Sequence, residues 1–265
     1  MDFKIIKAIE QRSTVEASAA ESKIIKTAEG NYCTAVIATG QGPYNLAAAS
    51  AASYCRQVLA ICEDMSVLSD KAAAWKIRVA EKVNSLNSKV YDAASELFVS
   101  TLVSGCAILI RPDYGINVVS IGNAVSIIKR SNSNEIAIGN RLDTAAYVTS
   151  ENGEVQNHPA DITLLSAIGL RQSIKPHASK TTLCSQDTVF LLSSGFARYI
   201  SQSCNILKEA DDLNLMSSAL IETIRTKRGL ACGDAVLGIR VEEGEGSENR
   251  TTDQTGVPAA PAEAR

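Results

Sequence analysis

The sequence predicts an α+β protein, a four-layer αββα sandwich in which two antiparallel sheets face each other and are flanked by helices. Short β-branched runs, separated by glycine, proline and asparagine, occur in both halves of the chain. Two long helical segments lie between these groups of strands, and another helix precedes the last strand. Because each sheet and each helix has an apolar side to bury, facing sheets covered by helices would bury all of them.

The first third of the chain alternates strand signals with polar breaks. We expect strands at 3–9, 22–27 and 32–38, with the last two joined by a turn at 29–31 that contains a glycine. Residues 44–62 are rich in alanine and contain neither glycine nor proline, which favours a helix.

A second helix follows, for which Ser69 or Asp70 is a suitable N-cap. Its large apolar residues recur at helical spacing and predict one buried stripe, formed by Trp75, Val79, Val83, Leu86 and Val90.

From residue 98 the apolar pattern returns to that of strands. We expect an antiparallel meander with strands at 98–110, 116–121, 125–129 and 135–138. Residues 141–161 are polar and irregular, which is typical of a long loop or flap.

The last part of the chain predicts a short helix, two strands, a strong helix and a final strand, at 162–168, 180–184, 188–193, 213–225 and 235–241. Lys227 and Arg228 are expected in the last turn of the strong helix, where they would cap it, and Gly229 is expected to end it. Lys129 and Arg130 are expected to be solvated at a strand end.

Composition indicates one folded domain at 1–241 and an acidic, disordered tail at 242–265. The chain has 265 residues, of which 45% are hydrophobic and 21% charged, as in soluble globular proteins. The net charge of −3 argues against a nucleic-acid-binding protein. The tail carries six acidic and two basic side chains and too few apolar residues to pack.

No apolar run approaches the roughly 20 residues that span a bilayer, and the N-terminus has no apolar signal core. The seven cysteines include no C-x-x-C pair, and only two histidines are available, so a zinc site is not expected. Most cysteines lie in apolar runs, and we expect them to pack as small hydrophobic residues in a reduced, cytoplasmic protein.

Four short loops carry the functional prediction, and each follows an apolar, β-branched run. They read T-G-Q-G-P at 39–43, I-G-N-A at 121–124, L-L-S-S-G at 191–195 and C-G-D-A-V at 232–236. In order and spacing they resemble the signature loops of the metal-dependent serine/threonine protein phosphatases, the PPM or 2C-type family. The resemblance covers nearly all of 1–241 and implies that family's sandwich fold.

In that family each loop supplies an aspartate, and the aspartates hold two divalent cations that activate a bridging water. The residues at those positions here are Thr39, which precedes Gly40, and Asn123, Ser194 and Gly233. Because Mg²⁺ and Mn²⁺ need anionic oxygen ligands, we expect no metal cofactor and no catalytic residues, and the resemblance implies a pseudophosphatase. A stretch at 12–16, R-S-T-V-E, weakly resembles the family's arginine followed by an acidic pair.

Nearby acids could keep one weak cation site. Asp234 is next to Gly233, and a shift of one residue would place its carboxylate at the site. The loop at 141–161 adds further acids, Asp143, Glu151, Glu154 and Asp161, although solvated surface charges are the simpler interpretation.

Other motifs favour structural interpretations. Ser193-Ser194-Gly195 lacks the G-x-S-x-G frame and the histidine base of a nucleophile elbow. His158 and His177 adjoin prolines in polar sequence and are expected in exposed loops. The glycines before Pro43 are expected to shape a turn rather than to bind phosphate, because the Walker lysine is absent.

We therefore expect a non-catalytic module that binds another protein, for example a phosphoprotein or a component of a kinase pathway. The alternative is an atypical active phosphatase that uses Asp234 and the acids of the 141–161 loop with Mg²⁺ or Mn²⁺. A third hypothesis is that the likeness is only architectural and that the chain is an N-terminal-nucleophile amidohydrolase. That class needs a processed Thr, Ser or Cys at the start of a strand.

Overall fold

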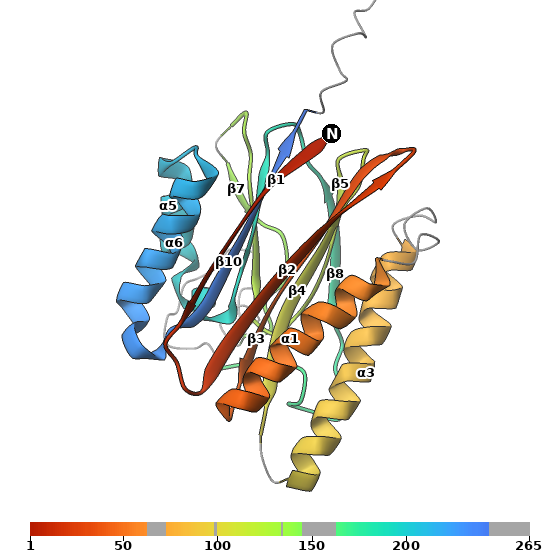
Figure 1. The fold of residues 1–265 in the computed structure, drawn as a ribbon, viewed down its shortest axis with the longest axis vertical. Helices are drawn as coiled ribbons and strands as arrows, with labels where there is room; N and C mark the ends of the chain where they lie inside the picture. The colour runs from red at the N-terminus through yellow and green to blue at the C-terminus, as the bar shows by residue number, and fades with distance from the viewer. Residues whose placement is uncertain (63–72, 98–99, 134, 145–162, 244–265) are drawn as a thin grey trace, which may run out of the picture.

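The computed structural model has two five-stranded antiparallel sheets packed face to face between layers of helices (Figure 1), so the predicted αββα sandwich is confirmed. The structure describes residues 1–62, 73–97, 100–133, 135–144 and 163–243. The predicted Ser69 or Asp70 cap, most of the 141–161 loop and nearly all of the acidic tail lie outside these residues.

The first sheet contains both the N-terminal strand and the C-terminal strand of the fold, side by side. Its order is β1 (Asp2–Gln11), β10 (Gly233–Glu242), β9 (Thr188–Leu192), β6 (Val125–Lys129) and β7 (Ile136–Ile138). β10 is hydrogen-bonded to β1 over its whole length and to β9 on its other side.

The second sheet is built around a long hairpin. Its order is β2 (Glu16–Thr27), β3 (Gly30–Gln41), β4 (Leu102–Ile110), β5 (Gly115–Ile121) and β8 (His177–Thr182). The predicted turn between β2 and β3 is confirmed, and the register pairs Glu16 with Gln41 at the far end of the hairpin.

Two helices cover each sheet (Figure 1). α1 (Tyr44–Ile61) covers β2, β3 and β4, and α3 (Ala73–Leu97) packs on α1 and β5. On the other sheet, α6 (Leu213–Arg228) covers β1 and β10, and α5 (Ile200–Glu209) covers β6 and β7. Short 3₁₀ helices, η1 (Ser194–Tyr199) and η2 (Gly229–Ala231), lead into α5 and into β10.

The apolar pattern of the chain explains the core between the sheets and the core beneath α1 and α3. Between the sheets, alternate residues of the central strands are fully buried, among them Ile37, Ile108, Val189, Leu191 and Leu237. The predicted stripe of α3 packs against α1 and β5 in the core outside the second sheet, with Trp75, Val79 and Val83 completely buried.

Two predictions were wrong, and two helical elements were not predicted. The expected meander ends after β5, because the chain crosses at 122–124 into the other sheet, where β6 pairs with β9 and β7. Residues 163–168 form no helix, and instead Leu164 and Ile168 make isolated bridges to Thr144 and Val103. The sequence analysis also missed η1 and α5.

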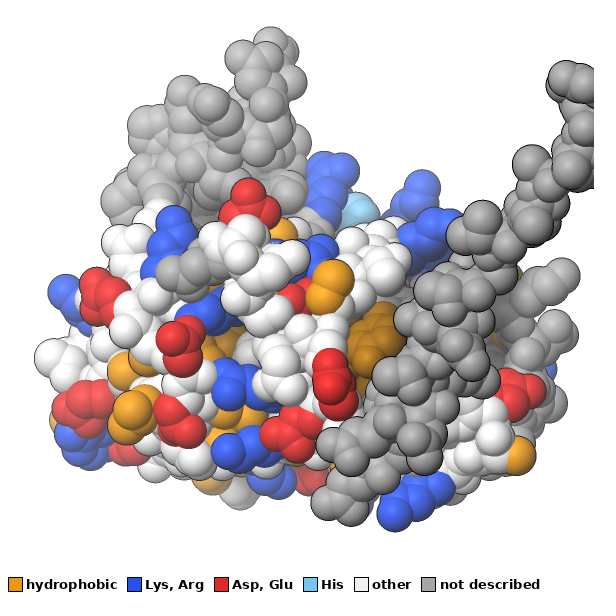
Figure 2. Space-filling view, turned by 90° about the horizontal axis from the view of Figure 1, so that it is seen from above, with side chains coloured by type: hydrophobic (Ala, Val, Ile, Leu, Met, Phe, Trp, Pro, Cys, Tyr) orange, Lys and Arg blue, Asp and Glu red, His pale blue; other side chains and the backbone are white. Residues whose placement is uncertain are grey.

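The end of the molecule that carries the N-terminus presents a mixed surface (Figure 2). Over much of this face, lysine and arginine side chains lie among aspartate and glutamate, with isolated apolar side chains between them. Within the described part of the chain, no helix is long and apolar enough to cross a membrane.

The buried stripe of α3 gives a direct test of the core. Trp75 is completely buried and donates a hydrogen bond from Nε1 to Cys62 Sγ, whereas Ile77 on the same helix is 58% exposed. We expect Trp75→Ala to lower the free energy of unfolding by about 3–5 kcal/mol. Ile77→Ala should change it by less than about 0.5 kcal/mol. Denaturation followed by circular dichroism measures both, and equal losses would contradict the assigned faces.

Candidate functional site

Three of the four signature loops meet at the end of the sandwich opposite the N-terminus. Thr39 lies near the end of β3, Ser194 begins η1 and Gly233 begins β10. Thr39 Oγ1 accepts a hydrogen bond from the Ser194 amide at 3.0 Å and lies 3.0 Å from Ser18 Oγ. Ser18 Oγ donates to the Gly233 carbonyl at 2.6 Å. The predicted positions therefore form one connected, neutral hydrogen-bond cluster.

The second loop joins this cluster through one intermediate side chain. Asn123 lies in the turn between β5 and β6, and its Oδ1 accepts a hydrogen bond from Ser104 Oγ at 2.9 Å. Ser104 is the cross-strand partner of Thr39 in the β3–β4 register. Asn123 thus lies next to the site and is connected to it through Ser104.

Gly40 has a steric role that accounts for its place after Thr39. A Cβ atom at Gly40 would lie 2.0 Å from the carbonyl oxygen of Ala47, so only glycine lets the first turn of α1 rest on β3. The prediction that these glycines serve backbone geometry agrees with this contact.

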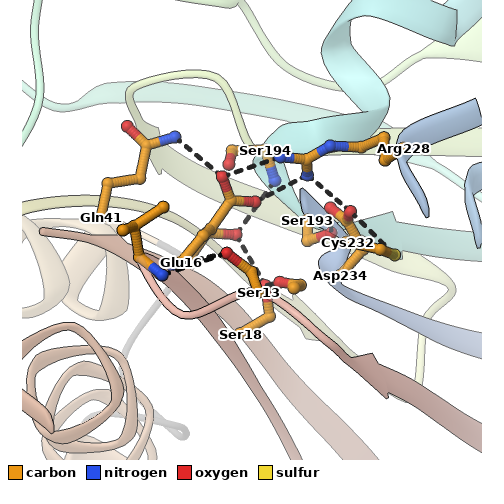
Figure 3. Close-up of polar contacts among 12 residues, drawn as sticks. Ser13, Glu16, Ser18, Gln41, Ser193, Ser194, Arg228, Cys232 and Asp234 are labelled. Atoms are coloured by element: carbon orange, nitrogen blue, oxygen red, sulfur yellow. Dashed lines mark hydrogen bonds and ion pairs between the residues drawn. The ribbon is translucent and has the colours of Figure 1, made fainter. Parts of the chain in front are cut away.

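Next to the neutral cluster lies a three-residue ion network, the arginine lock, formed by Glu16, Arg228 and Asp234 (Figure 3). Arg228 Nη1 donates to Glu16 Oε1 at 2.7 Å and to Asp234 Oδ2 at 2.6 Å, and Nη2 donates to Glu16 Oε2 at 3.0 Å. The side chains of Asp234, Glu16 and Arg228 are 0%, 8% and 17% exposed. The guanidinium therefore lies between two buried carboxylates.

Neighbouring side chains complete the hydrogen bonding of both acids. Ser193 Oγ donates to Asp234 Oδ1 at 2.6 Å, and Cys232 Sγ lies 3.4 Å from Asp234 Oδ2. Gln41 Nε2 donates to Glu16 Oε2 at 3.3 Å. Buried acids satisfied in this way are positioned side chains rather than solvated charges.

Gly195 provides the space for the lock. A Cβ atom there would lie 2.1 Å from Arg228 Nη1 and 2.2 Å from Asp234 Oδ1. The glycine of the third loop is therefore required by the arginine and the aspartate that it faces.

The lock shifts the acid–base equilibria of its members. Burial raises the pKa of Glu16, and pairing with Arg228 opposes that rise without cancelling it. For Arg228, burial lowers the pKa, but the bonds and charges of Glu16 and Asp234 outweigh it, and the net shift is upward. We take the pair as ionised, since arginine keeps its proton in proteins and the contacts are short. Burial and the charge of Asp234 raise the pKa of Cys232 to about 12, so this residue remains a thiol.

The sequence analysis missed the lock. It assigned Arg228 to capping the helix, but the side chain turns into the site from the last turn of α6, which Gly229 ends with a φ of 54°. The signal was the weak R-S-T-V-E match, because its Glu16 is the first residue of β2 and pairs with Arg228. Arg12 of that match pairs with Glu10 instead.

Asp143 is not a solvated surface charge, contrary to expectation. It is 7% exposed, its Oδ2 accepts a hydrogen bond from the Gly122 amide at 2.9 Å, and its Oδ1 lies 2.6 Å from His177 Nε2. His177 begins β8 and is partly buried, so the predicted exposed loop was wrong for it. His158 and the acids Glu151, Glu154 and Asp161 lie outside the described residues.

The basic pair at the end of β6 was also misassigned. Lys129 is 5% exposed and binds the Ala210 carbonyl and Asp211, while Arg130 pairs with Asp187 at 2.7 Å. Lys129 therefore holds β6 to the segment before α6, and Arg130 holds it to the residue before β9.

The donor set does not fit a pair of divalent cations. The Thr39 hydroxyl and the Asn123 amide oxygen already have protein partners, Gly233 has no side chain, and the two nearby carboxylates surround a guanidinium. Within the described ranges, no group of three or more His, Cys, Asp or Glu residues could hold a metal ion. Hard cations need anionic oxygens that are free to bind them.

Comparison with known proteins relates the chain to phosphatases through its fold. No protein-family model and no curated protein sequence matches it. A serine/threonine phosphatase from S. agalactiae superimposes with a TM-score of 0.72 at 15% identity, covering 91% of this chain and 99% of that one.

Two other solved structures give similar values. PppA from Pseudomonas aeruginosa has a TM-score of 0.66 at 14% identity, covering 90% of this chain and 97% of its own. The catalytic domain of the phosphatase PstP, in complex with two manganese ions, has a TM-score of 0.63 at 18% identity, covering 91% and 99%. The chain therefore has the fold of the PPM serine/threonine phosphatases, as its four loops predicted.

Thiol reactivity tests how tightly the site is closed. Cys184 is exposed and Cys204 is partly buried, whereas the other five cysteines are buried, as expected for most of them. We expect a disulfide reagent at pH 7.5 to modify one thiol rapidly in the native protein and all seven in denaturant.

Cys184→Ser should remove the rapid phase. A fast reaction that persists in this variant and disappears on adding Cys232→Ser would show that the lock is open in solution.

Proposed function

We propose that this protein is a phosphatase-fold domain that does not hydrolyse phosphoesters and acts by binding another protein. The observation that carries the proposal is the Arg228 guanidinium, bonded to both Glu16 and Asp234 at 2.6–3.0 Å. A guanidinium in this place excludes a dication by charge and by volume. Neutral residues at the four aspartate positions support the same conclusion.

Hydrolysis by this fold would require groups that the described residues do not bring together. A metal-activated water is needed to attack phosphorus, and cations are needed to neutralise the phosphoryl oxygens. Ser193 is bonded to Asp234 rather than to a base, so it does not form a nucleophile–histidine pair.

A regulatory, protein-binding role is supported by two observations. One structural neighbour, PppA, is described as a key regulatory component of T6SS in its organism. In this chain, Val15 and Leu230 are 62% and 83% exposed and lie one and two residues from Glu16 and Arg228. Because the lock joins Glu16 to Arg228, both apolar side chains lie at the same end of the molecule and could contact a partner.

The kind of partner that we propose is a phosphoprotein or a component of a kinase pathway, because the solved structures that share this fold are serine/threonine phosphatases. The second candidate, an active phosphatase that uses Asp234 and Asp143, would have to release both acids from their present partners. Asp234 is bonded to Arg228 and Ser193, and Asp143 to Gly122 and His177.

A turnover assay separates the two functions. With p-nitrophenyl phosphate or a phosphopeptide and millimolar Mn²⁺, we expect no hydrolysis above that of heat-inactivated protein. The catalytic domain of PstP, assayed in parallel, serves as the positive control. Hydrolysis that requires Mn²⁺ and is lost in Asp234→Ala would refute the proposal and establish the second candidate.

Metal dependence of stability gives an independent test. Because the loops are held by protein side chains, EDTA or added Mn²⁺ should leave the Tm of the wild-type protein unchanged to within about 1 °C. A rise of several degrees with Mn²⁺ would contradict the proposal.

A further inference from the structure

The arginine lock joins the two sheets beside the loops whose positions resemble those of metal-binding aspartates. Glu16 is the first residue of β2 in one sheet, and Asp234 is the second residue of β10 in the other. One Nη1 atom of Arg228 contacts both carboxylates. A single positive group therefore bridges the sheets at this end (Figure 3).

We infer that the Arg228 guanidinium is the resident cation of this site, and that its removal leaves a site for one divalent cation between Glu16 and Asp234. The inference rests on the proposed loss of catalysis, and it adds how the site is held: by a side chain of α6 instead of a metal. The guanidinium would then keep the loops in place independently of metal supply.

The charges of the site make a cation necessary. Both carboxylates are buried, and the charge of Asp234 acts against ionisation of Glu16. Without Arg228, two like charges would face each other in a low-dielectric site, and each would have to bind a proton or a new cation. A divalent cation satisfies both acids at neutral pH.

A third oxygen is available for that cation. Ser194 is 4% exposed, and its Oγ has no hydrogen-bond partner among the residues that the structure describes. Ser194 directly precedes Gly195, at which a Cβ atom would lie 2.1 Å from Arg228 Nη1 and 2.2 Å from Asp234 Oδ1. Two carboxylates, one hydroxyl and several waters are a sufficient ligand set for one Mg²⁺ or Mn²⁺, which commonly binds through one or two carboxylates.

The neutral cluster explains why only one cation is expected. Thr39 and Ser18 are bonded to each other, to the Ser194 amide and to the Gly233 carbonyl, so they hold the loops together without charge. They contribute no carboxylate to a second cation.

The test compares Mn²⁺ binding by the wild type and Arg228→Ala, measured from the electron paramagnetic resonance signal of free Mn²⁺. We expect Arg228→Ala to bind one Mn²⁺ per chain at least tenfold more tightly than the wild type, and its Tm to rise with Mn²⁺. Adding Glu16→Gln or Asp234→Asn to Arg228→Ala should abolish the gain.

Two controls separate the lock from general effects of charge. Arg228→Lys keeps a cation in place and should bind Mn²⁺ no better than the wild type. Arg225→Ala, on the same helix, removes an exposed arginine that pairs with Glu222, and it should likewise change nothing.

The outcomes are decisive even if Arg228→Ala folds poorly. A variant that is unfolded without Mn²⁺ and folds with it supports the inference, because the metal then replaces the guanidinium. A variant that binds Mn²⁺ no more tightly than the wild type, or that stays unfolded at millimolar Mn²⁺, overturns it. Neither result alters the turnover assay of the wild type, so the proposed function is tested separately.

Discussion

The contact of one guanidinium with two buried carboxylates is the interaction on which this end of the molecule depends. Arg228 comes from the last turn of α6, Glu16 from β2 and Asp234 from β10, so three elements that are distant in sequence meet at one charge. A buried carboxylate without a partner is costly, and two of them side by side are more so. The backbone around the site is adapted to this contact, since Gly195 leaves space for both Arg228 Nη1 and Asp234 Oδ1.

The elements of the fold were largely predictable because strand and helix patterns are local. β6 agrees with its expected bounds to the residue, and the apolar stripe of α3 is buried as its spacing predicted. The sheet to which a strand belongs is not set by its local pattern. The chain crosses between sheets at 122–124, and β5 and β6 have the same kind of apolar pattern although they lie in different sheets. The site was only partly predictable for the same reason. The four loop positions could be predicted from the strands and glycines around them. The pairing of Glu16 with Arg228 joins residues 212 positions apart, and no local pattern indicates it.

The packing of this fold does not depend on charged side chains at the four loop positions. Gly40 and the small residues of α1 allow this helix to approach β3 closely. The carboxylate positions are not needed for that packing, because Thr39, Ser18 and Ser194 close the same loops with neutral hydrogen bonds. A sandwich with a buried core between the sheets can therefore fold with neutral residues at these four loop positions.

The position of β10 has a consequence for how the chain is made. β1 is paired only with β10 in its sheet, although 221 residues separate the end of one from the start of the other. During synthesis the β2–β3–β4 sheet and its helices can assemble early, but β1 must wait until the ribosome has released β10. Until then its apolar face, and the unpaired edge of β9, are open to other chains. Closing the first sheet is therefore a late, long-range step, and chaperones would be needed most between the completion of α6 and the docking of the last strand.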